Sequence, residues 1–296
     1  MDEVEWRHEQ HFEPQAEANV FCGSSDAPTD DGNTVKGDWR EFRANLINAE
    51  QNEEQGTSGD AWSSRWTQEN LRLLQEQDRK LAREGLWAHE TEVPEVGGLL
   101  LARAEAPELN SDSRLCQLVV FILEHGPNGS KGLIINRPST ATVGDLLEWG
   151  YQPSQAYSQE DGKIMRESFA NSVIYLGGMF PPNRIARQPL TLIHGYSHLD
   201  GCREVSPGIY TGGEVQAGRE IAAGELKAGS FRFFAGLMEW ESTRLLQDIQ
   251  RGLWYTAACS RSLVIKQCLQ LPVPLWKEVL ILMGGSYAAV ARRRYM

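Results

Sequence analysis

The pattern of apolar and polar positions changes twice along the chain. Residues 1–37 are acidic and polar, with too few apolar side chains to offset the entropy of ordering them. Apolar residues then recur at helical spacing within residues 38–90, which predicts one helix over about 38–50 and a second over about 62–84. We therefore expect a disordered acidic segment followed by a helical extension.

The second predicted helix carries two tryptophans, Trp62 and Trp66, loosely on the side that also carries leucines. Leaving them in water would be unfavourable, because burying a large apolar side chain contributes roughly 1.5–3 kcal/mol. The extension should therefore dock, either on the domain that follows or on a partner chain.

From residue 97 onward, short apolar runs bounded by turn residues are typical of strands buried on both faces. The predicted strands are 97–103, 117–123, 131–137, 172–178, 190–195, 208–213, 231–236, 253–259 and 262–265. The predicted helices are 142–150, 214–226, 241–252 and 274–285. Residues 151–171 have no apolar period, so we expect a surface loop there. Strands that first cluster and then alternate with helices favour a mixed sheet in an α/β (mixed α+β) fold.

The net charge of −11 comes from the first third of the chain. Residues 1–96 hold 22 acidic and 9 basic side chains, whereas residues 97–296 hold 18 and 20. The predicted domain is thus nearly neutral and lacks the basic footprint of a nucleic-acid-binding protein. We also expect no membrane span, because no apolar stretch approaches the roughly 20 residues that one requires.

Eight segments, in their order and spacing, resemble the YqgE/AlgH family: GGLLLAR, VVFILEHGPNGSKGLIINRP, DLL, VIYLGGMF, IHGYS, GIYTGG, FRFFAGLMEW and GLWYTAA. The resemblance covers about residues 97–285. It implies an AlgH-like α/β domain over 97–296, with a curled, partly barrel-like mixed sheet and helices packed outside. The family has no agreed catalytic residues, and its bacterial members carry the label of candidate transcriptional regulators.

The segment DWREFRANLINAEQ, within the helical extension, is similar to one carried by plant members, many of which are plastid proteins. The resemblance therefore implies a chloroplast location; otherwise we expect a cytoplasmic protein. No transit peptide is visible, because residues 1–40 hold ten acidic and only three basic side chains.

Four polar residues next to predicted strands are the candidate binding residues. His125 lies at the mouth of a turn, where its pKa could be perturbed, and Asn136 and Arg137 end the next apolar run. Arg137 has the planar fork that suits a carboxylate or phosphate, and Arg232 lies between aromatic residues on a later strand. An anion site would require these side chains to converge on one cleft.

Each candidate also has a structural interpretation. His125 could bond the hairpin backbone, Arg137 could pair with Glu124 across the hairpin, and Arg232 could stack on aromatic rings. We expect no catalytic set, no metal and no cofactor, and we expect Cys259 to be a buried core thiol.

Three functional hypotheses follow. The leading one is a non-enzymatic regulatory or adaptor protein that binds an unidentified protein partner or small ligand. The second is an enzyme or anion-binding protein that uses the four candidate residues. The third is a DNA-binding transcriptional regulator, which would require affinity that falls steeply with salt.

Overall fold

The computed structural model describes residues 40, 42–46, 61–106, 115–151, 158–269 and 271–293. The chain divides into two units, Met1–Lys36 and Gly37–Met296, and all described residues belong to the second. The expected disorder of residues 1–37 lies outside the described part. Of the first predicted helix, residue 40 and residues 42–46 are helical, and the rest also lies outside it.

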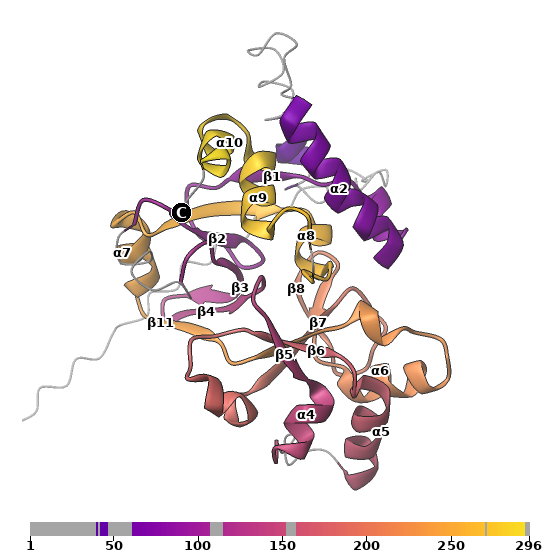
Figure 1. Cartoon of the computed structure of the whole chain (residues 1–296). Helices are drawn as coiled ribbons and strands as arrows, with labels where there is room; N and C mark the ends of the chain where they lie inside the picture. The colour runs from indigo at the N-terminus through magenta and orange to yellow at the C-terminus, as the bar shows by residue number, and fades with distance from the viewer. Residues whose placement is uncertain are drawn as a thin grey trace, which may run out of the picture. The chain divides into compact units, whose positions relative to one another are not determined.

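The described strands form two six-stranded sheets (Figure 1). The first has the order β1-β12-β2-β3-β4-β11, and all its neighbours are antiparallel. Its strands are β1 (Ala88–Glu90), β2 (Leu99–Ala102), β3 (Val119–Gly126), β4 (Gly129–Ile134), β11 (Met238–Glu241) and β12 (Trp254–Cys259).

The second sheet has the order β5-β6-β10-β7-β9-β8 and is mixed, because β10 runs parallel to β6 and antiparallel to β7. Its strands are β5 (Pro138–Thr142), β6 (Val173–Leu176), β7 (Leu190–His194), β8 (Arg203–Ser206), β9 (Ile209–Thr211) and β10 (Arg232–Ala235). The predicted mixed α/β class is confirmed. Neither described sheet closes into a barrel, since each ends on two different edge strands.

The apolar runs form strands because both faces of each sheet are covered. In β2, Leu99 and Leu101 face a core shared with the second sheet and with helices α8 (Arg261–Ile265) and α9 (Leu275–Met283). The alternate residue Leu100 joins a separate core under α7 (Arg244–Gln250). This two-sided burial explains why the strands are continuously apolar rather than alternating.

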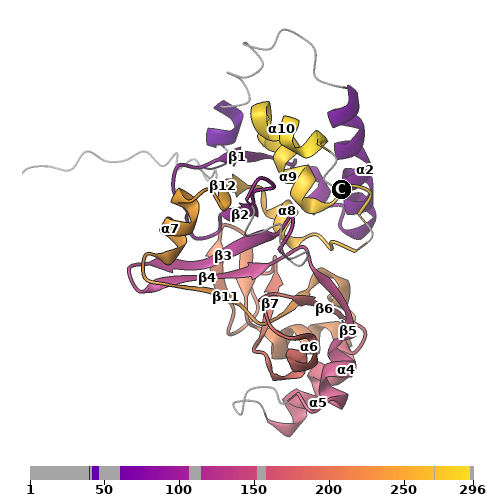
Figure 2. The ribbon, with the colours of Figure 1, turned by 60° about the vertical axis from the view of Figure 1, so that its left-hand side comes forward.

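Helices lie beyond the second sheet as well. α4 (Val143–Glu148), α5 (Gln159–Phe169) and α6 (Glu214–Ala222) gather beside β5, β6 and β7 at the end of the domain remote from α9 and α10 (Gly285–Arg292) (Figure 2). The remaining helical elements are α2 (Ala61–Gln77), η1 (Leu81–Arg83), η2 (Pro182–Arg187) and η3 (Ala228–Ser230). In the described residues no helix is both long enough and apolar enough to cross a bilayer.

Helix α4 begins as the sequence predicts. The Thr142 hydroxyl accepts the backbone N–H of Asp145, and the Asp145 carboxylate accepts the backbone N–H of Thr142 at 2.8 Å. These reciprocal bonds satisfy two of the N–H groups that a helix start leaves without partners.

Two predictions for the domain are wrong. Within the loop expected at 151–171, residues 159–169 form α5, because Ser158 and Asp161 make a second capping box and Met165 and Phe169 bury one face. Residues 262–265, expected as a strand, lie in α8. Beyond the predicted last helix the chain also continues into α10. Helix α8 has only five residues, which is too short to show a period of 3.6. Its apolar sequence therefore resembled that of a buried strand.

Helix α2 packs against the domain, which was one of the two docking alternatives for the extension. The helix ends at Gln77, and only η1 continues toward Glu84. Leu74 and Leu81 are buried against the domain residue Ile265. The side chains of Trp62 and Trp66, which motivated the prediction, lie outside the described part.

Candidate functional site

His125 lies at the tip of the β3–β4 hairpin, opposite Ser130. Its Nδ1 is 2.8 Å from the Ser130 hydroxyl, so it bonds a side chain across the turn rather than the hairpin backbone. The pairing of Arg137 with Glu124, one of the two alternatives for Arg137, is not seen: Glu124 contacts Lys131 at 3.1 Å, and Arg137 donates to the Cys116 carbonyl.

Asn136 and Arg137 lie at the opposite end of the same hairpin. The Asn136 side chain accepts the backbone N–H of Val119 at 3.0 Å and donates to the carbonyl of Gln117 at 2.8 Å. Arg137 donates to the Cys116 carbonyl, and burial lowers the pKa of its guanidinium from the ordinary value. Both side chains therefore tie the segment before β3 to the end of β4.

Arg232 is fully buried between the sheets. Its guanidinium donates to the backbone carbonyls of Val264 and Ile135. It also stacks on two rings, 4.3 Å from the centroid of Tyr175 and 5.0 Å from that of Phe234. The structural interpretation of Arg232 as a stacked core arginine accounts for these contacts.

The four candidates do not share one cleft. Asn136 contacts Val119, which lies six positions before His125 along β3. At about 3.3 Å per position, the two ends of the hairpin lie roughly 20 Å apart. Arg232 reaches the backbone beside Asn136 from inside the core. A common anion site that includes His125 is therefore excluded by the hairpin geometry, and a binding role for the others stays a prediction.

The other reactive side chains also have structural partners. His194 is buried in β7 and contacts the Gly212 carbonyl, whereas His198 is exposed and contacts Glu220. Burial raises the pKa of the Cys259 thiol to about 12, as expected of a core thiol. No described group of three His, Cys, Asp or Glu side chains is arranged to hold a metal ion.

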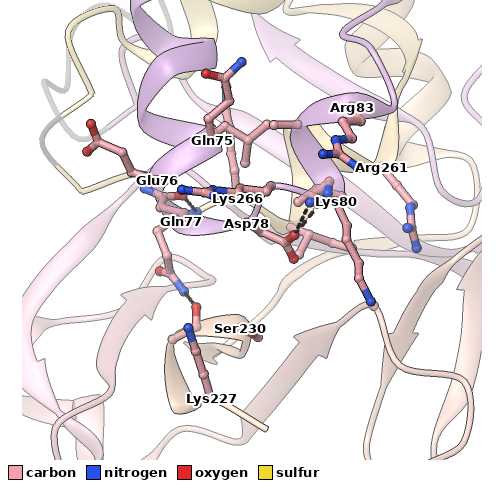
Figure 3. Close-up of a pocket in the computed structure, with 18 of the residues that line it drawn as sticks. Gln75, Glu76, Gln77, Asp78, Lys80, Arg83, Lys227, Ser230, Arg261 and Lys266 are labelled. Carbon is pink, nitrogen blue, oxygen red and sulfur yellow. Dashed lines mark hydrogen bonds between the residues drawn. The ribbon is translucent and has the colours of Figure 1, made fainter.

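A larger feature lies between the helical extension and the domain. It is a cleft of about 1310 Å³, which we call the extension cleft. Its walls are residues 72 and 74–83 of α2 and η1 on one side and residues 195–196, 225–227 and 229–230 of the domain on the other, with residues 261 and 265–267 between them. Figure 3 shows Lys80 and Lys227 on opposite walls.

The extension cleft is rich in cations, although the chain as a whole is acidic. Its lining includes seven basic and three acidic residues. Two of the basic side chains are neutralised, because Arg261 pairs with Glu84 and the buried Lys266 pairs with Glu278. The other five have exposed side chains and form no ion pair with any residue that the structure describes: Arg72, Arg79, Lys80, Arg83 and Lys227.

One carboxylate of the cleft already accepts hydrogen bonds from the backbone. Asp78 accepts the backbone N–H groups of Lys80 and Leu81 at 2.8 and 3.1 Å, where the chain turns from α2 into η1. Arg261 donates two hydrogen bonds to the Glu84 carboxylate. This pair raises the pKa of Arg261 above its ordinary value and holds the cation in place. Free positive charge therefore exceeds free negative charge across the opening.

The walls are held together by polar contacts between distant parts of the chain. The backbone N–H of Gln267 donates to the Gln77 side chain at 3.2 Å, and the Gln267 side chain donates to the carbonyl of Gly229 at 2.9 Å. Gln267 thereby links the extension wall to the domain wall. Among the lining residues, the hydroxyl groups are those of Tyr196 and Ser230, and the lining includes neither His nor Cys.

Sequence reasoning missed this cleft, although a signal was present. Four of the nine basic residues in the acidic first third fall within residues 72–83. They interleave with Leu74 and Leu81, which are buried. This local concentration of basic residues was visible in the sequence, but the domain wall of the cleft comes from segments more than 100 residues away.

Comparison with known proteins agrees with the fold. A family model described as AlgH-like matches residues 103–288. A UPF0301 protein from Chlorobium luteolum is 27% identical over 198 residues, covering 66% of this chain and 89% of that protein. One from Chlamydia muridarum is 28% identical over 201 residues, covering 67% and 90%. The cationic wall at residues 72–83 lies outside the residues that the family model matches.

Two solved structures are also similar to parts of this chain. The solution structure of the AlgH protein from Pseudomonas aeruginosa has a TM-score of 0.46 at 18% identity, covering 70% of this chain and 99% of that one. A crystal structure of a Corynebacterium diphtheriae protein has a TM-score of 0.48 at 18% identity, covering 69% and 95%.

Proposed function

Because the chain belongs to the AlgH-like family, we propose that it is a non-enzymatic regulatory or adaptor protein of that family that binds a partner in the extension cleft. The observation that carries the proposal is the set of five exposed cations without ion pairs among the described residues, gathered around one opening. Exposed like charges repel one another, so their clustering is best explained by an anionic group that they bind.

The chemistry of the lining supports binding rather than catalysis. A nucleophile with an adjacent base is the minimum set for covalent hydrolysis or transfer. The hydroxyls of Tyr196 and Ser230 have no histidine or cysteine beside them in the lining. The cleft also exceeds the roughly 300–1,000 Å³ of most small-molecule sites, which favours a macromolecular partner.

The proposal gives the helical extension a role. The domain supplies one wall, and the extension supplies the wall with four of the five free cations. In this view the extension adds a binding surface to a scaffold shared with family members. We also propose a chloroplast location, supported by the resemblance of the extension to that of plant members.

Site-specific photocrosslinking tests the function. A benzophenone amino acid replaces Ser230 in the full-length protein, and the same residue replaces the exposed Arg187 of η2 as the matched control. Both proteins are irradiated in stromal extract from plant chloroplasts. We expect a discrete crosslinked protein at position 230 only, competed by unlabelled wild type. Equal crosslinking at both positions, or none at 230, would contradict the proposal.

Two further outcomes would favour the other two hypotheses. Crosslinking of position 230 to DNA would support a transcriptional regulator instead. Turnover of a substrate that is lost on replacing Asn136 or Arg137 would support the enzyme hypothesis.

A further inference from the structure

We infer that the ligand of the extension cleft is an extended, acidic polypeptide segment of a partner protein. This inference rests on the proposed function and adds the chemical class of the partner. Its basis is the spacing of the cations along the cleft, the polar groups between them and the carboxylates that interrupt them.

The cations of the extension wall are spread out rather than focused on one point. Arg72 lies within α2, whereas Arg79 and Lys80 lie in the turn after it and Arg83 lies in η1. The cations of this wall are therefore carried by three successive segments of the chain. A single phosphate or carboxylate could reach only one or two of these groups. An extended chain can contact several of them at once.

Lys227 adds a cation from the domain wall, opposite Lys80 (Figure 3). A ligand between them would meet positive charge on both sides, and salt would weaken the attraction because these side chains are exposed. Extended peptides also present backbone N–H and C=O groups that need partners. The side chains of Gln75 and Ser230 line the cleft and can supply such bonds.

The lining argues against a nucleic acid as the ligand. Single strands bind through rows of aromatic side chains on which successive bases stack, whereas the lining has one aromatic residue, Tyr196. A phosphate backbone carries charge at every nucleotide and would meet the carboxylates of Glu76, Asp78 and Glu225. A peptide can place neutral residues at those points.

The test is the binding of a fluorescein-labelled ten-residue peptide of alternating glutamate and serine to the full-length protein, measured by fluorescence anisotropy. We expect saturable binding that weakens as NaCl rises from 20 to about 300 mM. The double substitution Lys80→Glu/Arg83→Glu should reduce affinity at least tenfold. The matched control Arg184→Glu/Arg187→Glu makes the same charge change on η2, outside the cleft, and should change affinity less than twofold.

Three outcomes would overturn the inference. They are equal loss of affinity in both double variants, displacement of the peptide by equimolar inorganic phosphate, and tighter binding of a twenty-residue oligothymidylate through the same residues. If Lys80→Glu/Arg83→Glu fails to fold, as judged by circular dichroism, the neutral Lys80→Gln/Arg83→Gln variant replaces it. A crosslinked partner at position 230 without peptide binding would refute the acidic segment but leave the proposed function standing.

Discussion

Asn70 of α2 donates a hydrogen bond from Nδ2 to Oε2 of Glu278 in α9, over 2.7 Å, although the two residues are 208 positions apart. The same amide group donates to the Val273 carbonyl at 3.0 Å and accepts the Val273 N–H at 3.2 Å. Asn70 is buried, so these bonds are shielded from water. This contact fixes the extension on the domain and thereby sets one wall of the extension cleft.

Replacing Asn70 with Ala should therefore destabilise the protein by about 2–3 kcal/mol, because it leaves the buried backbone groups of Val273 without partners and removes one of the bonds to the buried Glu278. Urea unfolding measures the loss. The control Gln75→Ala changes an exposed residue of the same helix and should stay within about 0.5 kcal/mol of wild type. A comparable effect of both substitutions would show that the Asn70 contacts do not hold the extension.

Cys259 should resist alkylation in the folded protein. Burial raises its thiol pKa to about 12, so the reactive thiolate is nearly absent at pH 8. Iodoacetamide labelling followed by mass spectrometry should modify the partly exposed Cys116 and Cys202 first, and Cys259 only in urea. Because the folded-state pKa is the higher one, the protein should lose stability as pH rises from about 9 towards 12. Rapid labelling of Cys259 at pH 8 would contradict its assignment as a core thiol.

His194 should stay neutral below the pH at which an exposed histidine gains its proton. Burial lowers its pKa, and Nδ1 accepts the backbone N–H of Tyr196, which places the proton on Nε2 facing the Gly212 carbonyl. A depressed folded-state pKa contributes stability that is present above about 6.5 and lost as pH falls.

Urea unfolding at pH 7.5 and 5.0 tests this expectation for His194. Wild type should lose more stability between the two values than His194→Phe, which cannot titrate. Nitrogen chemical shifts should report the Nε2–H tautomer at pH 7.5, and an imidazolium signal there would contradict the expectation.

Gly178 should not tolerate a side chain. A Cβ atom at this position would lie 2.2 Å from the Leu237 carbonyl oxygen, so the backbone would have to move. We expect Gly178→Ala to reduce the free energy of unfolding by about 2 kcal/mol or more. Gly162→Ala is the matched control, because Gly162 lies inside α5 with open space around it and should gain about 0.5–1 kcal/mol. A neutral Gly178→Ala would show that the backbone around Leu237 can move to admit a side chain.

The strands were predictable where burial alone decides structure. The runs at 117–123 and 131–137 became β3 and β4 because each residue meets a packed layer on one face or the other. The short strands β1, β5, β8 and β11 escaped prediction, since three to five residues show no clear alternation and pair only when a neighbouring edge is present. The candidate residues were found by their polar chemistry, but their partners were not: His125 bonds a near neighbour in sequence, whereas the carbonyl partners of Arg232 lie 32 and 97 residues away.

The sequence by itself determined the family, the mixed α/β class, the position of α4 and the separation of an acidic first third from a neutral domain. These follow from local pattern, turn chemistry and composition, which act over a few neighbouring residues. Only the tertiary structure divided the strands between two sheets, buried Arg232 on Tyr175 and brought Lys80 opposite Lys227. Such contacts join segments more than 50 residues apart, and their geometry is set by how whole layers pack.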